Sequence, residues 1–206
     1  RAFSVLCGAA SLFLFRGLCA RLLPPRARTT ALVLAVLCSS WIHAAQDARV
    51  YALVLLIALA TARLTLALEE SPTPRLWAAY ALTGAAGLYS HYYFAVLLAA
   101  HAAWLAPRAL RDPRRRAGFL CAHAAIAALF APWLTSFAAQ LRLHSGDPVL
   151  GEALTLRQGL DITGTMLFDA SYLGLLLPSW TRVAVGAAAL ALLAWDGALA
   201  RVDAQG

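Results

Sequence analysis

The run from His43 to Tyr51 contains the residue types best suited to chemistry in this sequence. Asp47 and Arg49 stand there as the only charges in a long apolar stretch of the chain. A charge flanked by membrane-length apolar sequence lies at a water boundary or is paired inside a helix bundle. The run therefore predicts one of two things: a short polar turn between two membrane segments, or a site for an anionic, lipid-borne substrate.

The spacing of the two charges limits what they can do together. If the run begins a helix, Asp47 and Arg49 point about 200° away from each other, so we expect each to need a different partner. Asp47 would share a face with His43 and Tyr51. Its carboxylate could orient an acceptor group, or it could be an exposed acid that stabilises a helix start. Arg49 could hold a phosphate with its paired donors, or it could be an ordinary interfacial arginine.

A second candidate region lies in an uncharged stretch from Leu76 to Pro107. As one helix this stretch would be about 48 Å long, against a hydrocarbon core of about 30 Å. We expect it to break between Gly87 and Tyr93. His91 in that break could bind a phosphate or a sugar hydroxyl, or it could be a hydrogen-bonded turn histidine.

The composition indicates an integral membrane protein. Of 206 residues, 62% are hydrophobic and only 13% are charged, whereas soluble domains are charged at about a quarter of their positions. The net charge is +7, but the arginines cluster beside apolar segments, which argues for topology signals and against a nucleic-acid partner. Four cysteines without metal or disulfide spacing are expected to be buried small hydrophobes, and they are Cys7, Cys19, Cys38 and Cys121.

These features predict an all-α, polytopic transmembrane helix bundle that forms a single domain over residues 1–206. The seven expected membrane segments are 2–23, 29–46, 50–68, 76–90, 92–107, 117–141 and 180–199. An external loop with short helices is expected over 142–170. Alternating the segments puts twelve arginines on one face and five on the other, so the twelve-arginine face is predicted to be cytoplasmic. The two candidate regions and the 142–170 loop then face outward together.

Four motifs resemble those of a known family, both in their residues and in their order and spacing along the chain. Gln46-Asp47-Ala48-Arg49-Val50-Tyr51-Ala52-Leu53 resembles the Q-E-A-R-x-Y-A-L signature of bacterial polyprenyl-phosphate-sugar glycosyltransferases. These belong to the GT-C class, family 39, which is akin to protein O-mannosyltransferases and the aminoarabinose transferases of lipid A. Arg1–Gly8 is similar to the pattern R-x-x-S-x-L-x-G, and Gly87–Phe94 is similar to G-L-Y-T-H-Y-F. Pro132–Leu141 is similar to P-W-L-P…Q-L.

The resemblance implies transfer of a sugar from a polyprenyl phosphate carrier to an acceptor hydroxyl on the external face, with inversion. It implies a multi-pass protein of the bacterial inner or plasma membrane, surrounded by membrane lipid. The acceptor would be a protein, a glycan or a lipid. No cofactor or metal site is expected, although some GT-C relatives use a divalent ion. Asp47 is implied as an accessory acid, and the implied substrate-binding residues are Arg49, His91, Gln46, Tyr51 and Tyr92.

Two departures qualify the resemblance. The family's catalytic acid lies in a first external loop that follows a first membrane helix, and both would precede Arg1. We therefore expect this chain to be a fragment that lacks that helix, that loop and the C-terminal part. The signature's Glu is Asp47 here, one methylene shorter.

Two competing functions remain open. A transporter or channel subunit would be expected to carry inverted repeats and polar residues at mid-membrane, and no internal repeat is visible. Another lipid-linked transferase, such as an O-antigen ligase, would use the same outward arrangement. His101 and His123 are expected to pack inside the bundle, and Asp161 and Asp169 of the external loop receive no role.

Overall fold

The computed structural model describes residues 1–47, 49–136, 138–139 and 184, and every regular element in these residues is a helix. The described residues divide into two compact units. The first contains Arg1–Ala52, and the second begins at Leu53. The predicted loop 142–170 lies outside the described residues, and so does the predicted segment 180–199 apart from residue 184.

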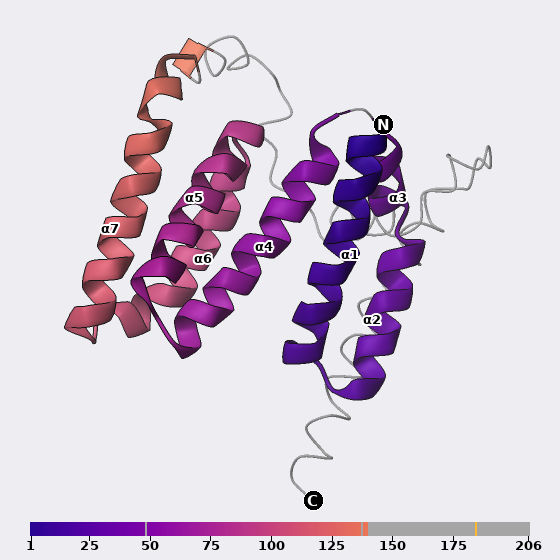
Figure 1. Cartoon of the computed structure of the whole chain (residues 1–206), viewed down its shortest axis with the longest axis horizontal. Coiled ribbons are helices and arrows are strands. Elements are labelled where there is room, and N and C mark those ends of the chain that lie inside the picture. Colours follow the sequence, from indigo (N-terminus) through magenta and orange to yellow (C-terminus); the bar gives the residue numbers. More distant parts are fainter. Residues whose placement is uncertain (48, 137, 140–183, 185–206) are drawn as a thin grey trace, which may run out of the picture. The chain divides into compact units, whose positions relative to one another are not determined.

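The first unit consists of α1 (Ala2–Leu22), α2 (Pro25–Leu37) and α3 (Ser39–Gln46) (Figure 1). Pro25 occupies the first turn of α2, where its missing N–H costs nothing. The segment expected over 29–46 is helical but not continuous, because the chain breaks at Cys38, whose ψ of 114° is extended. The two helices that result are bent by 48°. Cysteine and two serines follow one another at 38–40, and their low helix propensity favours a break there.

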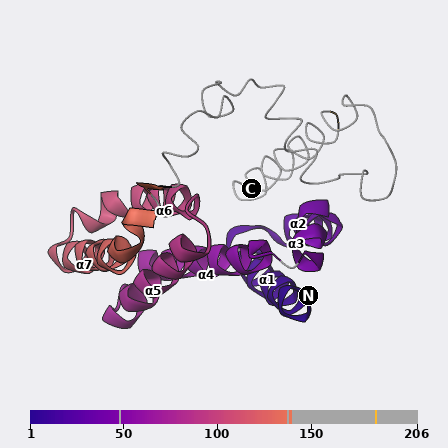
Figure 2. The same ribbon diagram turned by 90° about the horizontal axis from the view of Figure 1, so that it is seen from above.

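Helix α3 packs against α1 and α2 through small residues, and Figure 2 shows the three helices together from above. A side chain at Gly8 would come within 2.9 Å of the Cβ atom of Ala45, so only glycine permits this approach of α1 to α3. Trp41 donates a 3.3 Å hydrogen bond from its indole nitrogen to the Gly8 carbonyl oxygen. The same indole meets Phe15 edge-on, with ring centroids 5.5 Å apart. These contacts fix the last turns of α3, which carry the polar run.

The second unit contains most of α4 (Tyr51–Glu70), then α5 (Pro74–Ser90), α6 (Phe94–Ala109), α7 (Pro113–Phe130) and the short 3-10 helix η1 (Ala131–Trp133). The predicted break between two short segments is confirmed, because residues 91–93 separate α5 from α6.

Capping side chains and prolines define where the helices of the second unit begin. The Thr73 side chain accepts the Leu76 N–H at 3.2 Å before α5. Asp112 accepts the Arg114 N–H at 2.9 Å before α7. With Pro113 in its first turn, α7 starts four residues before the expected boundary at 117. The connection between α6 and α7 is therefore shorter than the gap between the expected segments 92–107 and 117–141.

A hydrophobic core joins α4, α5, α6 and α7. Tyr80 is fully buried in it, and Gly84 lets Leu98 and Ile126 approach the backbone of α5. The buried members of this core are Leu68, Trp77, Tyr80, Ala81, Phe94, Leu98, Leu105, Ala122 and Ile126.

Glu69 connects three helices at one end of this core. Its carboxylate forms an ion pair with Arg108 and accepts a 2.8 Å hydrogen bond from the Trp104 indole. Its backbone carbonyl oxygen accepts a 2.9 Å hydrogen bond from Arg115. The end of α4 is thereby held to α6 and α7.

Three of the described helices are long and apolar enough to cross a membrane, namely Ala2–Leu22, Tyr51–Glu70 and Pro113–Ser136, and α2 with α3 could form a fourth, bent span. Helix α6 is apolar but shorter. The described residues thus form an all-helical protein with several candidate membrane spans. None of the four cysteines, all of which lie within the described residues, forms a disulfide. Cys7 and Cys19 are buried as expected, Cys38 is half-buried, and Cys121 is exposed, which the expectation of burial got wrong.

Candidate functional site

Asp47 is the centre of a small charged cluster where α3 ends. Its backbone turns extended, with a ψ of 140°, and its N–H still donates to the His43 carbonyl oxygen at 2.8 Å. The carboxylate oxygen Oδ2 lies 3.9 Å from His43 Nε2 and 3.6 Å from Arg49 Nε. One carboxylate oxygen therefore faces an imidazole and a guanidinium. The Asp47 side chain is 23% exposed and that of Arg49 is 72% exposed, so the acid is sheltered and the cation is open.

This geometry corrects the expectation that Asp47 and Arg49 need separate partners. That expectation assumed that both residues stand in one helix. Instead, α3 ends at Gln46 and α4 begins at Tyr51. Asp47 and Arg49 both lie outside these helices, and their side chains contact each other there. The helical spacing holds for His43, whose imidazole reaches Asp47 from four residues earlier.

Gln46 and Tyr51 flank the charged cluster on its two sides. Gln46 is exposed and lines a cavity of about 350 Å³ together with Arg1, Val5 and Ala45. Tyr51 is the first residue of α4 and is 42% exposed. The polar end of α3 thus borders a space that a small polar group could enter, lined in part by the beginning of α1.

His91 shapes the second candidate region, the turn between α5 and α6. Its Nδ1 accepts the backbone N–H of Tyr93 at 3.3 Å, and its carbonyl oxygen accepts the Phe94 N–H at 2.9 Å. In a neutral ring this acceptor role places the proton on Nε2. The His91 side chain is therefore a hydrogen-bonded turn histidine, which was one of the two roles expected for it. An Nε2–H donor is also what a phosphate or sugar oxygen would require.

The aromatic side chains of this turn stack on one another. The His91 ring lies 5.2 Å from that of Tyr92 and 5.4 Å from that of Tyr93, nearly parallel to both. A side-chain hydrogen bond with Tyr93 raises the pKa of the Tyr92 hydroxyl above its usual value.

Two of the motifs that carry the family resemblance meet in space in the second unit. The Tyr89 hydroxyl donates a 2.8 Å hydrogen bond to the Leu129 carbonyl oxygen at the end of α7. The Tyr89 ring lies 5.7 Å from Phe130 and 6.0 Å from Trp133. The segments around residues 87–94 and 132–134 therefore form one end of this helix group.

The two mid-segment histidines lie in the core around Tyr80. The Tyr80 ring centroid is 6.5 Å from His101 and 5.7 Å from His123. This placement agrees with the expected packing role. Among the described residues, the Tyr80 hydroxyl, His101 Nδ1 and His123 Nε2 are buried without a hydrogen-bond partner.

The predicted site residues fall into two groups. Gln46, Asp47, Arg49 and Tyr51 belong to the first unit, and His91 and the adjacent Tyr92 belong to the second. Within the described ranges, no group of three or more His, Cys, Asp or Glu side chains could hold a metal ion.

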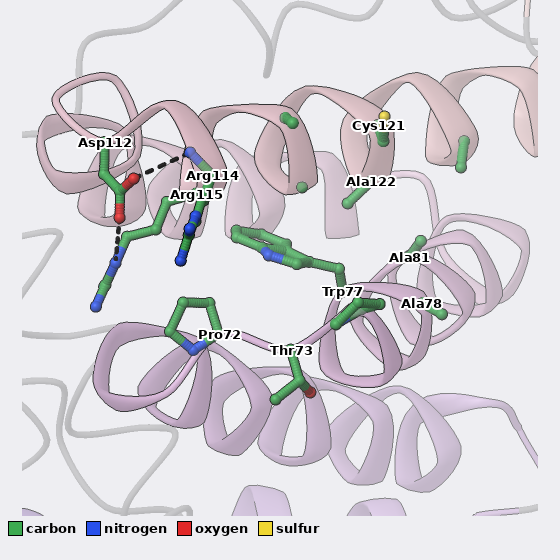
Figure 3. Close-up of a pocket in the computed structure, with 14 residues that line it drawn as sticks. Pro72, Thr73, Trp77, Ala78, Ala81, Asp112, Arg114, Arg115, Cys121 and Ala122 are labelled. Carbon is green, nitrogen blue, oxygen red and sulfur yellow. Dashed lines mark hydrogen bonds and ion pairs between the residues drawn. The ribbon is translucent and has the colours of Figure 1, made fainter.

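Sequence reasoning missed a pocket of about 760 Å³ between α5 and α7 (Figure 3). Trp77 and two arginines, Arg114 and Arg115, line it. The available signal was the Asp112-Pro113 helix start, which would have moved the beginning of α7 and placed both arginines on a helix facing α5.

No family model, curated protein or solved structure matches this chain.

Proposed function

We propose that this chain is the membrane part of a GT-C-type glycosyltransferase that moves a sugar from a polyprenyl phosphate carrier to an acceptor hydroxyl. The observation that supports it most is the Asp47–Arg49 pair, 3.6 Å apart at the end of α3. This pair lies inside the stretch with the strongest family resemblance. A sheltered acid beside an open guanidinium, between two apolar helices, suits a phosphate that arrives from the lipid.

In the proposed reaction the acceptor oxygen attacks C1 of the sugar and forms the new glycosidic bond. The bond between C1 and the phosphate oxygen breaks, and the polyprenyl phosphate leaves with that electron pair. The acceptor proton passes to a carboxylate base, which the resemblance places in a loop ahead of this sequence. Attack opposite the leaving group inverts the configuration at C1.

Arg49 has the role of phosphate ligand. Its two parallel N–H donors match two phosphate oxygens and stabilise the charge on the leaving group. Asp47 positions Arg49 and serves as the accessory acid. Gln46 and Tyr51 would contact the donor beside it. For His91 and Tyr92, which belong to the second unit, substrate binding remains the role that the resemblance implies.

We also propose a topology of seven membrane segments, with both candidate turns on the outward face of the bacterial inner membrane. This topology would present the site to the carrier and to an external protein, glycan or lipid acceptor. The clustering of arginine at the opposite ends of the segments supports this orientation.

The test uses the full-length protein in membranes with synthetic polyprenyl phosphate that carries mannose, glucose or arabinose. Consumption of one donor with release of polyprenyl phosphate is expected. Arg49→Lys keeps the charge but loses the paired donors, so its rate should fall about tenfold or more while helicity is unchanged. Arg26→Lys changes an exposed arginine at the beginning of α2, outside the proposed site. It is the matched control and should retain full activity. Undiminished transfer by Arg49→Lys would remove Arg49 from the site.

A further inference from the structure

The pocket between α5 and α7 has a polar end and an apolar length. Asp112, Arg114 and Arg115 line its polar end, and Trp77 lies beside them (Figure 3). Because the remaining side chains are small, the facing helices leave a groove of about 760 Å³ that larger residues would have filled. The small residues along the groove are Ala78, Ala81, Ala117, Gly118, Ala122 and Ala125.

The groove has the length of one membrane leaflet. From Asp112 to Ala125 it follows α7 for about 20 Å at 1.5 Å per residue. Half of a bilayer's hydrocarbon core is about 15 Å thick. Helix α7 begins a candidate membrane span at Pro113, so its first residues lie at headgroup level. The groove thus starts among the headgroups and continues into the acyl-chain region.

The two arginines differ in what they bind within the protein. Arg115 Nε lies 3.4 Å from Asp112 Oδ2, and its terminal nitrogen donates to the Glu69 carbonyl oxygen at 2.9 Å. The Arg114 backbone N–H donates to Asp112, whereas its guanidinium has no ion-pair or hydrogen-bond partner among the described residues. Figure 3 shows its side chain directed from α7 toward the side of the pocket that Pro72 and Trp77 form. The polar end therefore has one uncompensated positive charge.

We infer that this pocket binds an anionic membrane phospholipid, with the phosphate at Arg114 and an acyl chain along the groove. The guanidinium offers paired donors to the phosphate oxygens. Basic pockets between membrane helices are suited to acidic headgroups. An apolar helix in the same groove would leave the charge of Arg114 without a counterion. None of these residues belongs to the proposed sugar-transfer site, so the inference does not rest on that function.

Gly118 makes this arrangement possible. A side chain at Gly118 would collide with the Trp77 indole, so glycine lets the tryptophan lie flat against α7. Trp77 is 8% exposed and also meets Phe119 edge-on. It thereby forms a fixed wall next to the headgroup position.

The experiment measures lipid retention by native mass spectrometry. The full chain is purified in micelles that contain equal amounts of phosphatidylglycerol and phosphatidylcholine. The protein should retain phosphatidylglycerol in preference. Arg114→Gln should lower that retention about fivefold, the ratio that corresponds to the roughly 1 kcal/mol of one arginine near an anionic lipid. Arg111→Gln removes the same charge from the same turn, outside the pocket, and should have little effect.

A second variant tests the groove itself. Ala78 is exposed and lines the pocket, so Ala78→Leu should fold, fill the groove and reduce phosphatidylglycerol retention with Arg114 intact. Ala99→Leu, at an exposed position of α6, is its control. Equal retention of the two lipids, as a groove covered by another helix or a second copy would give, would overturn the inference. So would equal losses in Arg114→Gln and Arg111→Gln, or unchanged retention in Ala78→Leu. If Arg114→Gln does not remain monodisperse, the phosphatidylglycerol retention of Ala78→Leu decides the test.

Discussion

The Tyr89 hydroxyl and the Leu129 carbonyl oxygen, 40 positions apart in the chain, are joined by a 2.8 Å hydrogen bond. Leu129 lies in the last turn of α7, directly before the 3-10 helix η1. The side chain of Tyr89 reaches it from α5. The aromatic end of the second unit is therefore held by a specific polar contact as well as by packing.

Tyr89→Phe should consequently lower the free energy of unfolding by about 0.5–1.5 kcal/mol, the net value of one such hydrogen bond. The ring contacts with Phe130 and Trp133 remain in this variant. Thermal unfolding in detergent, followed by circular dichroism, measures the change. An unaltered melting temperature would show that the hydrogen bond adds nothing.

Tyr80→Phe should change the free energy of unfolding in the opposite direction. The Tyr80 hydroxyl is fully buried and has no partner among the described residues, so its removal relieves a desolvation cost. We expect stability to be unchanged or raised by up to about 1 kcal/mol, measured by the same unfolding experiment. A loss as large as that of Tyr89→Phe would mean that the hydroxyl has a partner.

Gly118→Ala should be destabilising because its new methyl group would collide with the Trp77 indole. Overpacking of this kind typically costs about 1–3 kcal/mol. The diagnostic control is the same substitution in a Trp77→Leu background, where the methyl group meets a smaller side chain. The cost of Gly118→Ala should shrink there, and a cost that stays the same would refute the collision.

Glu69→Ala should loosen the end of the second unit where α4, α6 and α7 meet. It removes the ion pair with Arg108 and the hydrogen bond from Trp104. Because Arg108 is more than half exposed, we expect a loss of only about 1–2 kcal/mol, most of it from the indole bond. Trp104→Phe should therefore reproduce part of the loss, whereas Arg111→Ala, at the same end, should not.

Single-cysteine labelling tests the orientation proposed from the arginine distribution. In a cysteine-free protein, Tyr92→Cys should react with an impermeant maleimide added outside intact cells, because Tyr92 is 41% exposed and its turn is proposed to face outward. Arg111→Cys, in the turn at the other end of α6, should react only after permeabilisation. The reverse pattern would invert the topology and place both candidate turns in the cytoplasm.

The sequence by itself determined the helical class and several helix boundaries. A charge-free stretch too long for one span required a break, and the break lies at residues 91–93, where it was expected. The ends of the first helix also agree to within a residue, since Pro24 and Pro25 stop it locally. These features are decided by length, proline and apolar composition, all of which act within a few residues.

Tertiary structure decided which side chains and which helices contact one another. Separate partners for Asp47 and Arg49 were expected if the polar run were helical, but α3 ends at Gln46, and the Arg49 guanidinium lies 3.6 Å from Asp47. The helix expected over 29–46 breaks at Cys38, where packing of small residues against α1 holds the second half. Which side chains face a groove depends on contacts far apart in the sequence. The pocket that Trp77 and Arg114 line exists only because α5 and α7 pack side by side, and no local pattern specifies that pairing.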